Sequence, residues 1–327
     1  MDFLQLIDPE LVADFEQRPD DLFTAMVVEN LAATRLDWGR GKPADSEILP
    51  PTQVQITERT IPGPYGDVPI VIYQPNVEAP RPAMLSLHAG AYVLGSPRDG
   101  AGQIPVAEYA GCTVVYVDYR LAPEHPFPAG AEDSFAALLW MAEHAGELGI
   151  DSKRIAVGGH SAGAGMAAAV ALMNRDRNGP DLIFQWLTAP MLDNRHDTPS
   201  GHSLTHRKAY NRDVSLRAWK MYLGDSFDGD VSPYAAPARA TDLSGLPPAY
   251  LTVGTMDLFR DETIEYAQRL MAAGVPTELA VYPGVFHSAE YAVPTASICQ
   301  RMRKDYLDAL KRALMAAETH PKANISR

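Results

Sequence analysis

The chain has 327 residues, enough for one large α/β domain with an added subdomain. Its formal net charge is −13 with no basic cluster, which argues against nucleic acid and anionic membranes as partners. Cys112 and Cys299 form neither a disulfide framework nor a metal-ligand spacing, and the first ten residues do not resemble a signal peptide. We therefore expect a protein of the cytoplasm, with no membrane-spanning segment and no metal.

The first part of the chain precedes the regular core. Residues 9–35 carry a broken apolar stripe, which predicts helix. The polar, proline-bearing segment 35–51 predicts a linker. Residues 53–60 alternate between polar and apolar, residues 68–73 are apolar, and prolines and glycines lie between them. This pattern predicts an antiparallel hairpin with a longer loop.

After the hairpin, short apolar strands alternate with helices. The predicted strands cover residues 83–87, 113–117, 154–157, 183–187, 249–253 and 277–282. The predicted helices lie near residues 100–110, 131–145, 162–175, 261–273 and 296–317. Strands separated by helices indicate a parallel sheet with helices on both faces. With the hairpin included, we predict an α/β fold with an eight-stranded, mostly parallel sheet.

One segment interrupts this alternation. Residues 194–232 contain no predicted strand and are too long for an ordinary connection. Their aromatic and methionine content argues against a disordered loop, which is the alternative. We therefore predict a helical insertion that packs with residues 1–45 as a cap. The α/β core would then consist of residues 46–193 and 233–327.

The most informative stretch is Gly159-His160-Ser161-Ala162-Gly163, which lies between an apolar run and a small-residue helix. Gly-x-Ser-x-Gly at a strand–turn–helix junction is the sequence of a nucleophile elbow. Side chains at the two glycines would collide with neighbouring backbone. The helix also points its free N–H groups at this turn, so the Ala162 N–H can bind an oxyanion. The alternative is a glycine-rich turn with an incidental serine.

A serine hydroxyl needs a base to act as a nucleophile. His287 follows the last predicted strand, and Ser161 also follows a strand, so both are expected at the carboxyl edge of the sheet. We therefore assign His287 as the base. An acid must orient the imidazole, and in this chain order it precedes the histidine. Asp257 and Asp193 both qualify, with position favouring Asp257, whereas Asp261 suits the first turn of a helix.

A second loop completes the expected site. His88-Ala89-Gly90-Ala91-Tyr92 follows the strand predicted at 83–87. Small residues let backbone N–H groups approach a reacting carbonyl, so this loop is a candidate oxyanion hole. The alternative is a plain turn.

These motifs resemble the hormone-sensitive-lipase family of α/β-hydrolase esterases over residues 83–290. The run from Asp118 to Ala129 is similar to the family's most specific stretch, which is structural. The run from Asp257 to Glu262 resembles the family's Asp-Pro-Leu-Arg-Asp-Glu, whose first Asp is the triad acid. The resemblance therefore favours Asp257 over Asp193. His287 falls where the family places its base.

The oxyanion loop resembles the family's His-Gly-Gly-Gly, which implies that the N–H groups of Gly90 and Ala91 act together with that of Ala162. The chain also departs from the family. Ala89 and Ala91 replace glycines, and an alanine disfavours positive φ. His160 stands where Asp or Thr is usual, which suggests a packing role beside the elbow. Ser288-Ala289-Glu290 replaces the usual Gly-Phe after the base.

The resemblance implies a serine carboxylesterase that hydrolyses short- to medium-chain esters through an acyl-enzyme, without a metal or organic cofactor. The implied triad is Ser161, Asp257 and His287. A serine amidase or acyltransferase of the same fold and a non-catalytic small-molecule receptor remain as alternatives. Because the last strand is expected at a sheet edge, we also expect a homodimer formed through strand 277–282 and helix 296–317.

Overall fold

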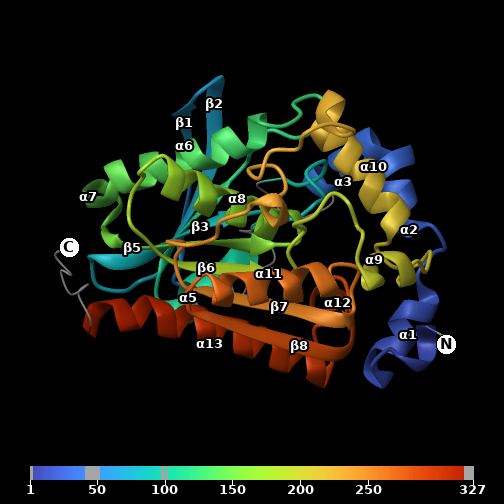
Figure 1. Cartoon of the computed structure of the whole chain (residues 1–327). Helices are drawn as coiled ribbons and strands as arrows, with labels where there is room; N and C mark the ends of the chain where they lie inside the picture. The colour runs from blue at the N-terminus through green and yellow to red at the C-terminus, as the bar shows by residue number, and fades with distance from the viewer. Residues whose placement is uncertain (1–2, 41–51, 97–99, 101, 320–327) are drawn as a thin grey trace.

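The computed structural model describes residues 3–40, 52–96, 100 and 102–319. An eight-stranded sheet forms its centre, in the order β1-β2-β4-β3-β5-β6-β7-β8 (Figure 1). The strands are β1 (Gln55–Gly63), β2 (Gly66–Gln74), β3 (Arg81–Leu87), β4 (Thr113–Val117), β5 (Ile150–His160), β6 (Leu182–Thr188), β7 (Ala249–Met256) and β8 (Thr277–Phe286). β2 is antiparallel to β1 and β4, and all other pairs are parallel. The predicted fold class is confirmed.

Helices cover both faces of the sheet, and each face buries its own hydrophobic cluster. On one face lie α6 (Ala129–Glu143), α8 (Ala162–Asp176) and α11 (Arg260–Ala272); on the other lie α5 (Gln103–Ala110) and α13 (Ser297–Thr319). Short helices α7 (Ala145–Leu148) and α12 (Ala289–Ala292) follow α6 and β8. No helix within the described ranges is long and apolar enough to cross a membrane.

β5, β7 and β8 extend beyond their predicted carboxyl ends, and the added residues reach the site. The predicted strands ended before Gly158, Gly254 and Gly284, whereas the observed strands continue through these glycines. The glycines are needed inside the sheet instead, because neighbouring backbone is too close for a side chain. A Cβ at Gly158 would lie 2.7 Å from the Trp186 oxygen, and one at Gly254 would lie 2.0 Å from the Val285 oxygen.

The hairpin prediction was right in its pairing and wrong in its loop length. Gly63 and Gly66 are still paired across β1 and β2, so only two residues connect the strands. Gly66 has φ +125°, a conformation that suits glycine and closes the turn tightly. The prolines and glycines that predicted a longer loop are therefore partly strand.

The helix predicted at 9–35 is broken into four pieces: α1 (Pro9–Gln17), α2 (Leu22–Thr24), a π-helical turn η2 (Ala25–Glu29) and α3 (Leu31–Arg40). The first break follows from Pro19, since Arg18 before it is extended with ψ 139°. The linker prediction was wrong for residues 35–40, which are helical. Its remainder, 41–51, lies outside the described residues.

The segment 194–232 contains α9 (Pro199–Ser203) and α10 (Arg212–Leu223). Asn211 caps α10 by accepting from the N–H groups of Asp213 and Val214. Both helices lie beside the N-terminal helices in Figure 1, and Phe23 packs edge-on against Tyr210 with ring centroids 5.6 Å apart. We call residues 9–40 and 199–223, which contain α1, α2, η2, α3, α9 and α10 with the segments that connect them, the helical layer.

Candidate active site

Ser161 occupies the sharp turn between β5 and α8. Its backbone has φ 56° and ψ −120°, a strained conformation for a residue with a side chain. A Cβ at Gly159 would lie 2.5 Å from the Leu87 oxygen, and one at Gly163 would lie 2.0 Å from the same atom. The turn can therefore form only because both flanking residues are glycine, as the elbow pattern requires.

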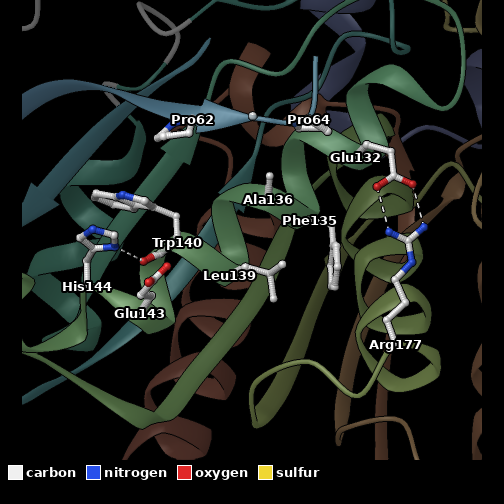
Figure 2. Close-up of a pocket in the computed structure, with 11 residues that line it drawn as sticks. Pro62, Pro64, Glu132, Phe135, Ala136, Leu139, Trp140, Glu143, His144 and Arg177 are labelled. Carbon is white, nitrogen blue, oxygen red and sulfur yellow. Dashed lines mark hydrogen bonds and ion pairs between the residues drawn. The ribbon is translucent and has the colours of Figure 1, made fainter. Parts of the chain in front are cut away.

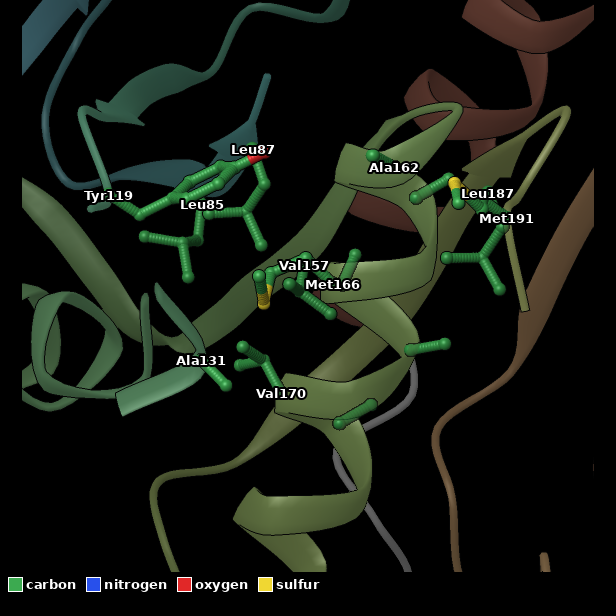
Figure 3. Packing of buried hydrophobic residues seen from close by; sticks show 14 of the residues in the cluster. Leu85, Leu87, Tyr119, Ala131, Val157, Ala162, Met166, Val170, Leu187 and Met191 are labelled. Carbon is green, nitrogen blue, oxygen red and sulfur yellow. The ribbon is translucent and has the colours of Figure 1, made fainter. Parts of the chain in front are cut away.

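The helix after the elbow is held firmly. Figure 3 shows side chains of β3 and β5 packed against α8, with Val157 and Met166 near the centre of the contact. Met166 and Val170 are both almost fully buried. Ala162 is the first residue of α8 and has no exposed surface. This packing fixes the helix N-terminus, and with it the Ala162 N–H, beside the serine.

The three predicted triad residues come together at the carboxyl ends of three strands. His287 directly follows β8 and Asp257 directly follows β7. His287 Nδ1 lies 2.8 Å from Asp257 Oδ2, and His287 Nε2 lies 2.9 Å from Ser161 Oγ. Each of the three is at most 5% exposed. The imidazole is therefore placed to take a proton from the serine hydroxyl.

Asp257 is itself fixed in place. Its Oδ1 accepts a hydrogen bond from the Phe259 N–H at 2.9 Å, so only Oδ2 is directed at His287. Burial alone would lower the pKa of His287, but the charge and hydrogen bond of Asp257 outweigh it and raise that pKa above its ordinary value. Glu290 and Glu262 add to this effect. The environment thus favours the imidazolium that forms when the serine is deprotonated.

Asp193, the other candidate for the triad acid, is engaged in a different interaction. Asp193 accepts a bidentate ion pair from Arg195, with Arg195 Nη2 2.6 Å from its Oδ2. Burial opposes ionisation of Asp193, yet the Arg195 hydrogen bonds hold its pKa below the usual range. Asp261 accepts from the Ser200 N–H at 2.6 Å and so holds the first turn of α9. Of the three aspartates considered, Asp257 has the hydrogen bond to His287.

The candidate oxyanion loop adopts the positive-φ backbone that such a turn needs. Gly90 has φ +119°, and a Cβ there would lie 2.2 Å from the Leu94 oxygen. Ala91 has φ +55° in spite of its methyl group. The Leu94 N–H donates to the Gly90 oxygen at 2.7 Å and closes the turn. The alanine therefore takes the left-handed conformation that the family's glycine would take freely.

Residues far apart in the sequence support this loop. Tyr119, within the run that the resemblance marks as structural, stacks on His88 at 3.9 Å and donates from its hydroxyl to the His88 oxygen at 2.7 Å. Arg35 of α3 donates from Nε to the Val93 oxygen at 2.7 Å. The role of Arg35 could not be predicted from the sequence, because nothing in its neighbourhood relates it to residue 93.

A cavity with a substantial apolar lining lies away from the triad. It has a volume of about 520 Å³ and is bordered by the β1–β2 turn, α6 and Arg177. Figure 2 shows Glu132 facing Arg177, with both Arg177 amino groups bonded to the carboxylate at 2.7 and 2.8 Å. These two charges satisfy each other, and none of the residues that line the cavity belongs to the triad or to the oxyanion loop.

Comparisons with known proteins agree with this geometry. The family described as alpha/beta hydrolase fold matches residues 84–290. Carboxylesterase NlhH of Mycobacterium tuberculosis is 38% identical over 318 residues, covering 95% of this chain and 97% of that protein. The solved structure of a bacterial heroin esterase superposes with a TM-score of 0.89 at 39% identity, covering 96% of this chain and 99% of that chain. Esterase LipW from Mycobacterium marinum superposes with a TM-score of 0.81 at 34% identity, covering 95% and 96%. The chain belongs to the hormone-sensitive-lipase-like family of α/β-hydrolases, in which these relatives are esterases.

Proposed function

We propose that this chain is a serine carboxylesterase that works through an acyl-enzyme. The observation that supports this most is the pair of hydrogen bonds made by His287, 2.8 Å to Asp257 and 2.9 Å to Ser161. Ser161 Oγ attacks the ester carbonyl while His287 Nε2 takes its proton. The imidazolium then protonates the leaving alcohol, and Asp257 keeps Nδ1 protonated and directed. Water repeats the sequence on the acyl-enzyme and releases the acid.

The oxyanion of each tetrahedral intermediate needs backbone donors. We assign this role to the N–H groups of Gly90, Ala91 and Ala162. The positive φ values at Gly90 and Ala91 and the position of Ala162 at the start of α8 support the assignment. No metal or organic cofactor takes part in this mechanism.

We further propose that residues 1–45 and 194–232 form a cap and that the substrates are small esters of short- to medium-chain acids. Within the described part of these segments, Trp219 and Tyr222 of α10 pack on Tyr92, the residue after the oxyanion donors. The Tyr92 and Tyr222 rings are 4.1 Å apart. A wall of buried aromatic rings beside the reacting carbonyl limits the length of an acyl chain.

The decisive experiment removes the nucleophile. Ser161→Ala should lower kcat by roughly 10⁶-fold on an aryl ester while the protein stays folded, because the triad acts as a unit. An organophosphate should add one phosphoryl group to the wild type and none to the variant, as read by intact mass. More than a few per cent of residual activity in a clean preparation would contradict the assignment.

Two alternatives are separated by simple assays. An amidase or acyltransferase would keep the triad, so an ester and its matching amide should be compared in parallel, with and without an added alcohol acceptor. A receptor of the same fold would bind a small molecule without turnover and would not be labelled by an organophosphate. We expect hydrolysis of the ester to dominate.

The assembly and location are also part of this proposal. β8 lies at the edge of the sheet, and Val281 on it is 39% exposed. We propose a homodimer through β8 and α13, which light scattering at micromolar concentration would contradict by giving a mass near 35.6 kDa. We assign the protein to the cytoplasm, consistent with its unpaired, buried Cys112 and Cys299, and cell fractionation tests this.

A further inference from the structure

His160 is the last residue of β5 and directly precedes Ser161. Its ring is buried and faces His287, with centroids 5.3 Å apart and planes inclined by 24°. Tyr291 meets its ring edge-on at 4.9 Å. A histidine at this position therefore contacts the catalytic base and does more than fill space beside the elbow.

The hydrogen bonds of His160 define its protonation. Thr188 Oγ1 donates to the Gly159 oxygen at 3.0 Å, so its lone pairs face His160 Nδ1 at 3.1 Å. Nδ1 must then carry the hydrogen. Burial and the charge of His287 hold the pKa of His160 well below its usual range, so the ring is neutral and Nε2 is an acceptor. Nε2 accepts from Ser288 Oγ at 2.9 Å.

Ser288 is the residue directly after the base. It has φ 62°, in the left-handed region, and it precedes α12 without capping that helix. Its hydroxyl is directed to His160 instead. The bond thus connects the residue before the nucleophile to the residue after the base, across a chain separation of 128 residues. It also supports the strained backbone of Ser288, which directly follows His287.

On the basis of the proposed function, we propose that His160 is a positioning residue for His287. It limits the movement of the imidazole by contact with one face and fixes its backbone through Ser288. His287 must hold Nε2 near the serine and Nδ1 near Asp257 at once. A shift of about 1 Å is enough to cost roughly 100-fold in rate.

A matched pair of substitutions tests this directly. Glutamine at residue 160 places its amide oxygen about where Nε2 lies and can still accept from Ser288. Asparagine places its amide about where Nδ1 lies and can reach only Thr188. We expect His160→Asn and Ser288→Ala each to lower kcat by about 10- to 100-fold with KM nearly unchanged, and His160→Gln to retain most of kcat.

The double variant His160→Asn/Ser288→Ala should be no slower than the slower single variant, because both remove one interaction. Ser134→Ala is the control, since Ser134 is a buried serine whose hydroxyl donates to the Gly130 oxygen within α6. It should leave kcat unchanged. Thermal unfolding of every variant identifies effects that come from stability alone.

Several outcomes would overturn the inference: equal kcat for the Asn and Gln variants, additive effects in the double variant, or losses confined to KM. Should His160→Asn fail to fold, Ser288→Ala, which deletes a single hydroxyl, still gives the answer. If Ser161→Ala retains activity, the proposed function fails together with this role. If activity depends on Ser161 but the Asn and Ser288→Ala variants match wild type, only the positioning role fails.

Discussion

The carboxyl edge of the sheet, which carries the triad, and the helical layer are held in place by different kinds of contact. At the sheet edge, Ser161 and His287 are fully enclosed, joined by short hydrogen bonds and attached to strand ends. The helical layer contacts His287 through Tyr210, with ring centroids 5.3 Å apart. Part of its internal attachment is an exposed ion pair between Arg207 and Asp21. The chemistry thus lies at the strand ends, and the layer beside it is attached to the core by buried rings as well as by exposed charges.

A second comparison concerns two buried histidine–glutamate pairs beside the triad. His160 Nδ1 lies 3.5 Å from Glu290 Oε1, and His196 Nδ1 lies 3.6 Å from Glu262 Oε2. Each histidine also uses Nε2 in a bond to a serine hydroxyl, and the partner of His196 is Ser215 of α10 at 2.8 Å. The first pair is internal to the core, whereas the second joins the core to the helical layer. The same chemistry therefore serves positioning in one place and attachment in the other.

After loss of the nucleophile, the largest effect is expected from substitution of Asp257, one of the two candidate acids. Asp257→Asn should lower kcat by roughly 10⁴-fold, because an amide stabilises the wrong tautomer of His287. Asp193→Asn is the matched control and should cost far less, since Asp193 is paired with Arg195. Both are measured on an aryl ester at fixed pH. The opposite ranking would transfer the role of acid to Asp193.

The free energy of unfolding should depend on the buried contacts of the helical layer and hardly at all on its exposed ones. Phe15 of α1 is fully buried and packs on Phe286, the residue before the base, at 5.2 Å. Phe15→Ala should lower the free energy of unfolding by about 3–5 kcal/mol, as is usual for such a truncation. Arg207→Ala removes the exposed ion pair and should leave the free energy of unfolding unchanged within error. Denaturant titration checks both, and equal losses would show that the layer depends on its surface charges.

The pH dependence of kcat/KM should show that the buried glutamates Glu290 and Glu262 raise the pKa of His287. Burial raises the pKa of Glu290 and of Glu262 to about 7, and their negative charge helps to raise the pKa of His287. Neutralising either one by Glu290→Gln or Glu262→Gln should lower the pKa of His287. The base is active when neutral, so the acidic limb of kcat/KM should move to lower pH.

The control for this prediction is Glu265→Gln, an exposed carboxylate on the same helix as Glu262. This substitution should leave the acidic limb of kcat/KM at the same pH, because exposed charges are well screened. The charges facing His287 from its neighbours also include Asp257, while His160 beside it is neutral. An acidic limb that stays unmoved in both Gln variants would mean that neither carboxylate is charged when His287 titrates.

The sequence was sufficient for the sheet and for placing Ser161 and His287 at its carboxyl edge because these are encoded locally, whereas the choice of Asp257 over Asp193 needed the family resemblance. Gly159 and Gly163 mark the elbow, and His287 follows an apolar strand. The strand ends were misjudged where a glycine such as Gly254 serves close packing and does not form a turn. Contacts such as that of His160 with Ser288 were not predictable, because they depend on how distant loops meet.

The helical layer was the least predictable region for the same reason. Its apolar positions indicate helices, but Arg35 and its bond to the Val93 oxygen connect elements that no local pattern relates. The break at Pro19 could have been expected from the rule for residues before proline. Local rules therefore gave the elements, and tertiary contacts decided how the elements support the site.

The smallest expected effects are the differences in kcat/KM between esters whose acyl chains differ by one methylene. Each methylene that still fits should add up to roughly 0.8 kcal/mol of binding, so kcat/KM should rise as the chain grows. The rise should stop once the chain meets the almost fully buried rings of Tyr92, Tyr222 and Trp219, of which Tyr92 and Tyr222 are stacked and Trp219 is tilted against both. We expect the maximum between about two and eight carbons, because displacing these rings would open a packed cluster.

A series of aryl esters from acetate to palmitate measures this, with the alcohol part held constant. Tyr222→Phe keeps the ring and is the control, whereas Tyr222→Ala removes the wall and should move the maximum to longer chains. Because the enlarged space accommodates the acyl chain, Tyr222→Ala should change kcat/KM for the acetate ester much less than for the longer esters. A rise that continues to palmitate in the wild type, or activation at an oil–water interface, would contradict a bounded pocket. Either result would mean that the helical layer leaves the site open to long chains.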